Sequence, residues 1–97
     1  FTGLEKVKQR PVLVLSKGEI NKFSADFICC GITSNIQNIG HSILIDNKDL
    51  ESGYLPKPSR IKVDVIFTLE KSCAIKGIGN IKEETLKNVK EEFLKLF

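Results

Sequence analysis

No stretch of this sequence is apolar over the roughly 18 residues that a membrane-spanning helix needs. No tract has the pattern of a secretory signal either. We therefore expect no membrane partner. Hydrophobic residues make up 41% of the chain and charged residues 28%, which is ordinary for a folded globular protein and argues against disorder. The length of 97 residues is that of a single domain.

Residues that bind metals are scarce. The chain has three cysteines, Cys29, Cys30 and Cys73, and one histidine, His41. The cysteines lack C-x-x-C spacing, and one histidine cannot complete a zinc site with such scattered thiols. Adjacent Cys29 and Cys30 on a strand would point to opposite faces and could not pair comfortably. We expect no metal and no cofactor, and cysteines that serve as small buried hydrophobes in a reducing cytoplasm.

A strong charge of one sign is also missing. Lys and Arg number 15 and Asp and Glu 12, so the net charge is only +3. This balance permits a polyanionic partner such as a nucleic acid but does not require one. Aromatic residues are 7% of the chain and form no cluster on which bases could stack. The composition therefore argues against a stacking platform for single strands.

The residues that are present predict a mainly β chain. Aliphatic runs predict strands at 11–16, 27–33 and 42–46, and 73–79 predicts a further short strand that ends at a glycine turn. The glycine and prolines of 47–59 predict a connection. The clearest pattern lies at 60–71, where one apolar set alternates with a mostly polar one: Ile61, Val63, Val65, Phe67 and Leu69. Period 2 predicts a long strand with one buried face and one mostly polar face.

The periodicity changes from Glu83 onward and predicts a closing helix. Leu86, Val89, Phe93 and Leu96 or Phe97 recur at steps of three and four residues, which is typical of an amphipathic helix. Several short strands followed by one helix predict a small, strongly bent sheet or barrel that the helix covers.

Four segments in order resemble the MazF/PemK/Kid toxins of type II toxin–antitoxin systems. They are KQRPVLVLS (8–16), GITS (31–34), PSRIKVDVIFTLEK (58–71) and IGNIKEETLKNVKEEF (78–93), and the likeness covers nearly the whole chain. The resemblance implies a small SH3-like barrel of the MazF/CcdB type with a C-terminal helix, which usually forms a homodimer. It also implies metal-independent cleavage of single-stranded RNA through a 2′,3′-cyclic phosphate. A cognate antitoxin is the expected protein partner.

Two positions carry the family's catalytic residues most directly. The resemblance makes Arg10 the arginine that stabilises the charge growing on the phosphate, or donates a proton, and makes Thr33 the phosphate anchor. Each also has a simpler interpretation. Arg10 could cap the strand through a salt bridge to Asp26 or Glu19, and Thr33 could be an ordinary turn residue at a strand end.

A second group of site residues is matched less closely. Lys62 and Asp64 stand where Kid-type toxins carry an arginine and an aspartate, and period 2 sets both on one polar face. Asp64 is the candidate base. The expected RNA contacts are Lys8, Ser34, Arg60 and Lys62. The family arginine is lysine here and loses the planar fork, and a charged strand face is often only a solvated surface. We expect His41 to be an exposed bystander.

The family also carries a strand before the loop that begins here at Phe1. The chain has no methionine, so we expect residues upstream, and we treat 1–97 as a single domain that lacks its usual first strand. Two other functions fit the same fold. One is a gyrase-binding poison like the CcdB toxins, for which the Arg10 and Thr33 segments would be unnecessary. The other is a relative that binds nucleic acid, DNA or RNA, without cleaving it.

Overall fold

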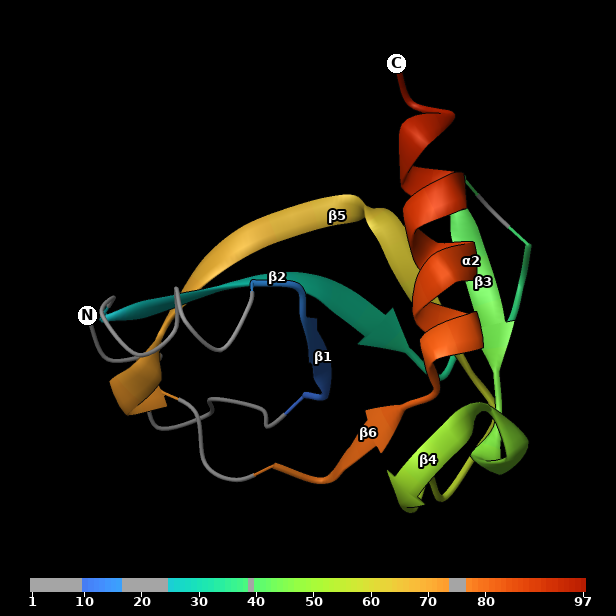
Figure 1. The fold of residues 1–97 in the computed structure, drawn as a ribbon, viewed down its shortest axis with the longest axis horizontal. Coiled ribbons are helices and arrows are strands. Elements are labelled where there is room, and N and C mark those ends of the chain that lie inside the picture. The colour runs from blue at the N-terminus through green and yellow to red at the C-terminus, as the bar shows by residue number, and fades with distance from the viewer. Residues whose placement is uncertain (1–9, 17–24, 39, 74–76) are drawn as a thin grey trace.

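The computed structural model describes residues 10–16, 25–38, 40–73 and 77–97, and it consists mainly of strands with one C-terminal helix. A four-stranded antiparallel sheet has the order β1-β2-β5-β3, and β4 pairs with β6 as a separate ribbon. The bounds are β1 Val12–Val14, β2 Asp26–Thr33, β3 Ser42–Ile45, β4 Leu50–Gly53, β5 Ser59–Glu70, β6 Gly79–Ile81 and α2 Glu83–Leu94. Figure 1 shows the sheet strongly curled, with α2 beside β3. The prediction of a mainly β fold with a C-terminal helix is confirmed, and neither α2 nor any other helix among these residues is long and apolar enough to cross a membrane.

Two predicted boundaries were wrong. The segment 50–53, predicted as part of a connection, is β4, and the strand predicted at 73–79 begins only at Gly79. Lys71–Cys73 forms a single 3-10 turn instead. The β4–β6 pair depends on backbone approach rather than apolar alternation: a Cβ on Gly53 would lie 2.1 Å from the Ile78 carbonyl oxygen. Glycine allows that approach, and a hydrophobic pattern does not reveal it.

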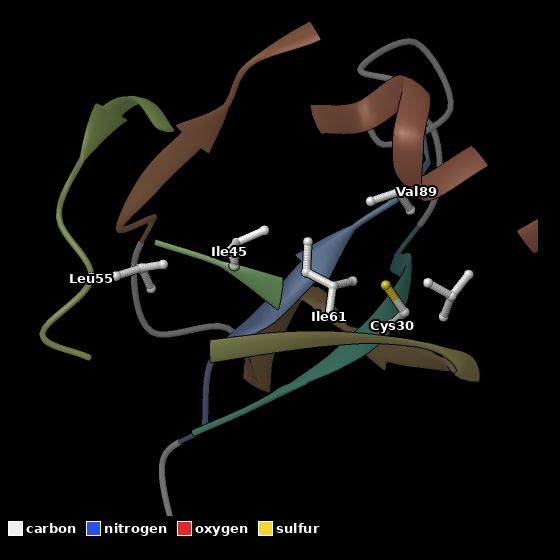
Figure 2. Packing of buried hydrophobic residues seen from close by; sticks show 6 residues of the cluster. Cys30, Ile45, Leu55, Ile61 and Val89 are labelled. Atoms are coloured by element: carbon white, nitrogen blue, oxygen red, sulfur yellow. The ribbon is translucent and has the colours of Figure 1, made fainter. Parts of the chain in front are cut away.

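The core lies between the curled sheet and α2. Its buried residues are Cys30, Ile45, Leu55, Ile61, Val63 and Val89. Figure 2 shows five of them, Cys30, Ile45, Leu55, Ile61 and Val89, pointing toward a common interior from different elements. On α2 the predicted apolar stripe is confirmed at Val89, which is buried, and at Phe93, which packs against the core. The last residue of the predicted stripe, Phe97, is 89% exposed.

The prediction for β5 was correct in its first half and wrong in its second. Ile61 and Val63 are buried at 0% and 2% exposure, but Val65 is 40% and Phe67 37% exposed. The reason is a β-bulge: Gly31 pairs with Lys62, while its neighbour Cys30 pairs with Ile66. The three residues of β5 between Lys62 and Ile66 have no partners on β2. Because three is an odd number, the β5 side chains after the bulge lie on the opposite face from the one that regular alternation predicts. Figure 1 shows β5 bending in its middle.

Candidate functional site

A pocket of about 170 Å³ opens on the side of the sheet opposite the core. It is lined by Thr33, Asn35, Gln37, Gly40, Ser42, Arg60, Lys62 and Asp64. These residues come from the end of β2, the connection that follows it, the start of β3 and the first half of β5. The pocket therefore brings together four residues predicted from the sequence, Thr33, Arg60, Lys62 and Asp64.

Strand register explains why these side chains meet. Thr33 pairs with Arg60 across β2 and β5, and Ser42 pairs with Lys62 across β3 and β5. Directly paired residues in an antiparallel sheet share a face. Because Ile61 is buried in the core, Arg60 and Lys62 on either side of it point to the opposite face. The sheet thus supplies one hydroxyl from each of β2 and β3 and two cations from β5 between them.

The connection after β2 forms a wall of the pocket by turning on its own side chains. The Asn35 amide donates to Thr33 Oγ1 at 3.1 Å, and the Gln37 amide donates to Asn35 Oδ1 at 3.2 Å. Side chains of these types commonly close such turns. The sequence analysis missed Asn35 and Gln37, although the polar run directly after Thr33 was a usable signal. Since Thr33 Oγ1 accepts a hydrogen bond here, its hydroxyl proton stays available for donation.

The Arg60 guanidinium is held in place by hydrogen bonds to neighbouring parts of the chain. Its Nε donates to the Ile36 carbonyl oxygen at 3.0 Å, and its Nη1 donates to Ser42 Oγ at 3.1 Å. The guanidinium thus links β5 to the connection and to β3. The Lys62 side chain, in contrast, has no hydrogen bond or ion pair within the parts of the chain that the structure describes. Of the two cations, Lys62 is therefore the one whose side chain is not held by the protein among the described residues.

Asp64 lies against the connection at Gly40 and His41. The His41 amide points at Asp64 Oδ2 over a long contact of 3.5 Å. Gly40 has φ +68, and a Cβ there would lie 2.7 Å from the same oxygen. His41 was predicted to be an exposed bystander, and the structure shows a partly exposed ring that has a partner on α2. Its side chain is 43% exposed, and its Nδ1 bonds Glu92 Oε2 at 3.0 Å.

Two predicted residues among those described, Arg10 and Ser34, lie outside the pocket lining. Arg10 is exposed, precedes β1, and forms no ion pair among the described residues, so the alternative of a cap to Asp26 is not seen. Continuing the β1–β2 register by two residues sets Arg10 opposite Thr33. Ser34 is exposed at the end of β2. Lys8, like Glu19, falls outside the described residues.

The thiols of β2 belong to the interior. Cys29 and Cys30 are free and completely buried, as expected for a strand covered on both faces. Burial raises the pKa of the Cys29 thiol. Burial, together with the neighbouring Cys29, raises the pKa of the Cys30 thiol to about 11. Both therefore stay protonated and unreactive at neutral pH. Across the described ranges, His, Cys, Asp and Glu form no group that could hold a metal ion.

Comparison with known proteins identifies the family. The PemK-like, MazF-like toxins of type II toxin–antitoxin systems match residues 1–97. No curated protein sequence matches significantly. The Mycobacterium tuberculosis toxin MazF-mt6 superposes with a TM-score of 0.77 at 20% identity, over 89% of this chain and 83% of that one. An Mtb toxin gives 0.78 at 19%, over 91% and 92%.

A third solved structure is described as an endoribonuclease in complex with its cognate antitoxin, from a mycobacterial species. It gives a TM-score of 0.74 at 20% identity, over 89% of this chain and 78% of that one. Likeness at this level of identity establishes the common fold, and the family match spans the whole chain. The protein belongs to the PemK-like, MazF-like family of toxins of type II toxin–antitoxin systems.

Proposed function

We propose that this toxin is an endoribonuclease that cleaves single-stranded RNA without a metal ion. The observation that carries the proposal is the pocket in which the Thr33 hydroxyl, the Lys62 ammonium and the Asp64 carboxylate line one cavity. Family membership adds support, because a neighbour with the same fold is described as an endoribonuclease. A cationic and hydroxyl-bearing pocket suits a phosphodiester, and a carboxylate beside it suits a proton acceptor.

The reaction needs only groups of the RNA and of the chain. The 2′-hydroxyl oxygen attacks the adjacent phosphorus and gives its proton to Asp64, while the bond from phosphorus to the 5′-oxygen breaks. The products are a 2′,3′-cyclic phosphate and a 5′-oxygen that takes up a proton. Thr33 donates a hydrogen bond to a phosphate oxygen, and Lys62 attracts the RNA backbone.

Arg10 would stabilise the charge that builds on the phosphate during the reaction. Negative charge builds on the phosphate oxygens as the five-coordinate state forms, and a guanidinium stabilises that state more than the ground state. Arg10 is exposed directly before β1, and the extended register sets it opposite Thr33. From there Arg10 would act on the phosphate bound at the pocket, as stabiliser or proton donor. Ser34, Lys8 and Arg60 are assigned to RNA contacts, with Arg60 acting mainly through the connection that it holds.

Two protein partners complete the proposal. A cognate antitoxin would inhibit the toxin in the cytoplasm, as the description of the mycobacterial complex suggests for that protein. A second copy of the chain would cover the apolar surface formed by Val14, Val65 and Phe67, which are between 37% and 40% exposed. Val14 and Phe67 both pair with Cys29, so they share one face of the sheet.

The experiment is cleavage of a mixed-sequence RNA in EDTA by the full chain, with end-group analysis of the products. Arg10→Ala is expected to lower the rate on the order of 10²–10³-fold, and Asp64→Asn on the order of 10²–10⁴-fold. Lys90→Ala, an exposed helix lysine, is the matched control. Cyclic phosphate ends from the parent and the control support the proposal. A folded parent that binds RNA or gyrase but cleaves no RNA overturns it.

A further inference from the structure

The backbone at Gly40 and His41 is fitted closely to Asp64. The His41 amide is the only hydrogen-bond donor to the Asp64 carboxylate among the described residues. The His41 carbonyl oxygen accepts from the Val63 amide at 3.0 Å, directly before Asp64 in β5. The carboxylate oxygen also occupies the space that a Cβ on Gly40 would need. The position of the His41 backbone therefore constrains where the carboxylate can lie.

The His41 ring connects this backbone segment to α2. Its Nδ1 bonds Glu92 Oε2 at 3.0 Å, and Lys95 Nζ lies 3.2 Å from the other oxygen, Oε1. The Glu92 side chain is only 21% exposed, less than half the exposure of the His41 ring. α2 contacts both β3 and β5 and runs beside β3 in Figure 1, so Glu92 projects from an element packed on the core. Glu92 is therefore held in place by a packed helix, whereas His41 belongs to an irregular connection.

We propose that His41 and Glu92 are positioning residues for Asp64, an inference that rests on the proposed role of Asp64 as base. Glu92 fixes the His41 ring, and the ring fixes the peptide whose N–H meets the Asp64 carboxylate. The substrate needs its 2′-hydroxyl within hydrogen-bond reach of that carboxylate. A displacement of the order of 1 Å in such an arrangement can cost roughly 10²-fold in rate. The pair would thus act on turnover through the position of the Asp64 carboxylate.

A simpler role would be to fasten the connection to α2 for stability alone. In that case the loss of the pair would lower the melting temperature but leave turnover intact at temperatures where the protein is folded. Positioning instead predicts a fall in kcat with an almost unchanged KM, because the missing interaction acts on the reacting geometry. The two roles are therefore separable by kinetics on folded protein.

The test uses His41→Ala and Glu92→Ala in the full chain, assayed with a defined RNA oligonucleotide at a temperature where each variant is folded. Both are expected to lower kcat on the order of 10–10²-fold, with KM changed less than about twofold. Glu92→Gln keeps an acceptor for the ring and should restore most of kcat. Glu91→Ala is the matched control on the exposed side of the same helix. Lys95→Ala removes the other partner of Glu92 and should leave kcat nearly unchanged.

A second readout does not depend on cleavage. The ¹³C carboxyl resonance of Asp64, assigned by comparison with Asp64→Asn, should move in His41→Ala and Glu92→Ala and stay in place in Glu91→Ala. If the parent cleaves no RNA, the proposed function fails, and this resonance still decides whether the pair positions the carboxylate. A resonance that stays fixed in both variants overturns the inference. Unchanged kcat in both, with an active parent, overturns it as well.

Discussion

The two halves of β5 carry the same alternating pattern and have opposite surroundings. The first half is paired on both sides up to Lys62, by β2 and by β3, and Ile61 and Val63 lie in the core. The second half is paired only with β2, and Val65 and Phe67 are more than a third exposed. The bulge opposite Gly31 separates the two halves. An alternating sequence therefore specifies a strand but not which of its faces is covered.

The same bulge divides the sheet face opposite the core into a polar part and an apolar part. Before it, that face carries Arg60 and Lys62 and borders the pocket. After it, the face carries Val65, whose Cγ1 lies 3.7 Å from where a Gly31 Cβ would be, and then Phe67. A polar pocket and an apolar surface thus adjoin on one strand. The first half suits a substrate, and the second half suits a protein neighbour.

The largest expected effect comes from shortening a buried side chain in the first half of β5. Ile61→Ala removes a completely buried side chain from the core cluster, and the free energy of unfolding should fall by about 2–5 kcal/mol. Phe67→Ala is the comparison in the second half. Because Phe67 is 37% exposed, its loss should cost roughly half as much. Urea titrations of both variants and the parent measure the difference.

Protein concentration sharpens this test. If a second copy covers Phe67, the cost of Phe67→Ala should grow with protein concentration, while that of Ile61→Ala should not. An equal cost of the two substitutions at every concentration would mean that both halves of β5 are equally part of the core. The contrast between the halves would then be wrong.

The fold was largely predictable, and the failures have physical causes. The strong signals, alternation at 60–71 and the stripe from Leu86 to Phe93, correspond to β5 and α2, since local pattern and burial agree there. β4 was missed because its pairing depends on the close approach of Gly53 to β6. The face of Phe67 was mispredicted because a bulge is a property of two paired strands and leaves no mark on one of them.

The candidate site was predictable only where it lies on strands. Thr33, Lys62 and Asp64 were found through the family resemblance and the polar face of the alternating strand, and the structure brings them to one pocket. Asn35, Gln37 and Gly40 were missed, because turns and left-handed glycines in a polar connection carry no periodicity. The link from His41 to Glu92 spans 51 positions, so no local pattern could indicate it.

A smaller effect is expected from Gly40→Ala, which acts on the pocket half of β5. Gly40 has φ +68, where a side chain costs about 1–2 kcal/mol. The new Cβ would also displace the Asp64 carboxylate from 2.7 Å away. We therefore expect a fall in stability of about 1–2 kcal/mol and a loss of cleavage larger than that fall alone would cause.

Gly77→Ala is the matched control for Gly40→Ala. No atom lies within 4 Å of a Cβ built on Gly77, so this change should be neutral or stabilise by about 0.4–1 kcal/mol. Denaturant titrations and cleavage assays of both variants provide the measurement. If Gly40→Ala were as harmless as Gly77→Ala in both, the connection would not be fitted to Asp64.

The smallest expected effect is the pH-dependent contribution of Glu92, which ties the pocket half of β5 to α2 through His41. Hydrogen bonds from His41 and then Lys95 lower the pKa of Glu92 below its ordinary value of 4.5. A carboxyl whose pKa is lower in the folded state stabilises the protein at pH values above its unfolded-state pKa, and that stabilisation disappears as pH falls through its folded-state pKa.

Glu92→Gln should therefore be slightly less stable than the parent at pH 7, and this loss of stability should be smaller than that of Gly40→Ala. The difference should vanish at pH values well below 4.5. Melting temperatures of the parent, Glu92→Gln and the exposed control Glu91→Gln across this range test the sign. A stability difference that grows toward acid pH would show that the ionised carboxylate opposes folding, and Glu92 could then not be the residue that holds the His41 ring in place.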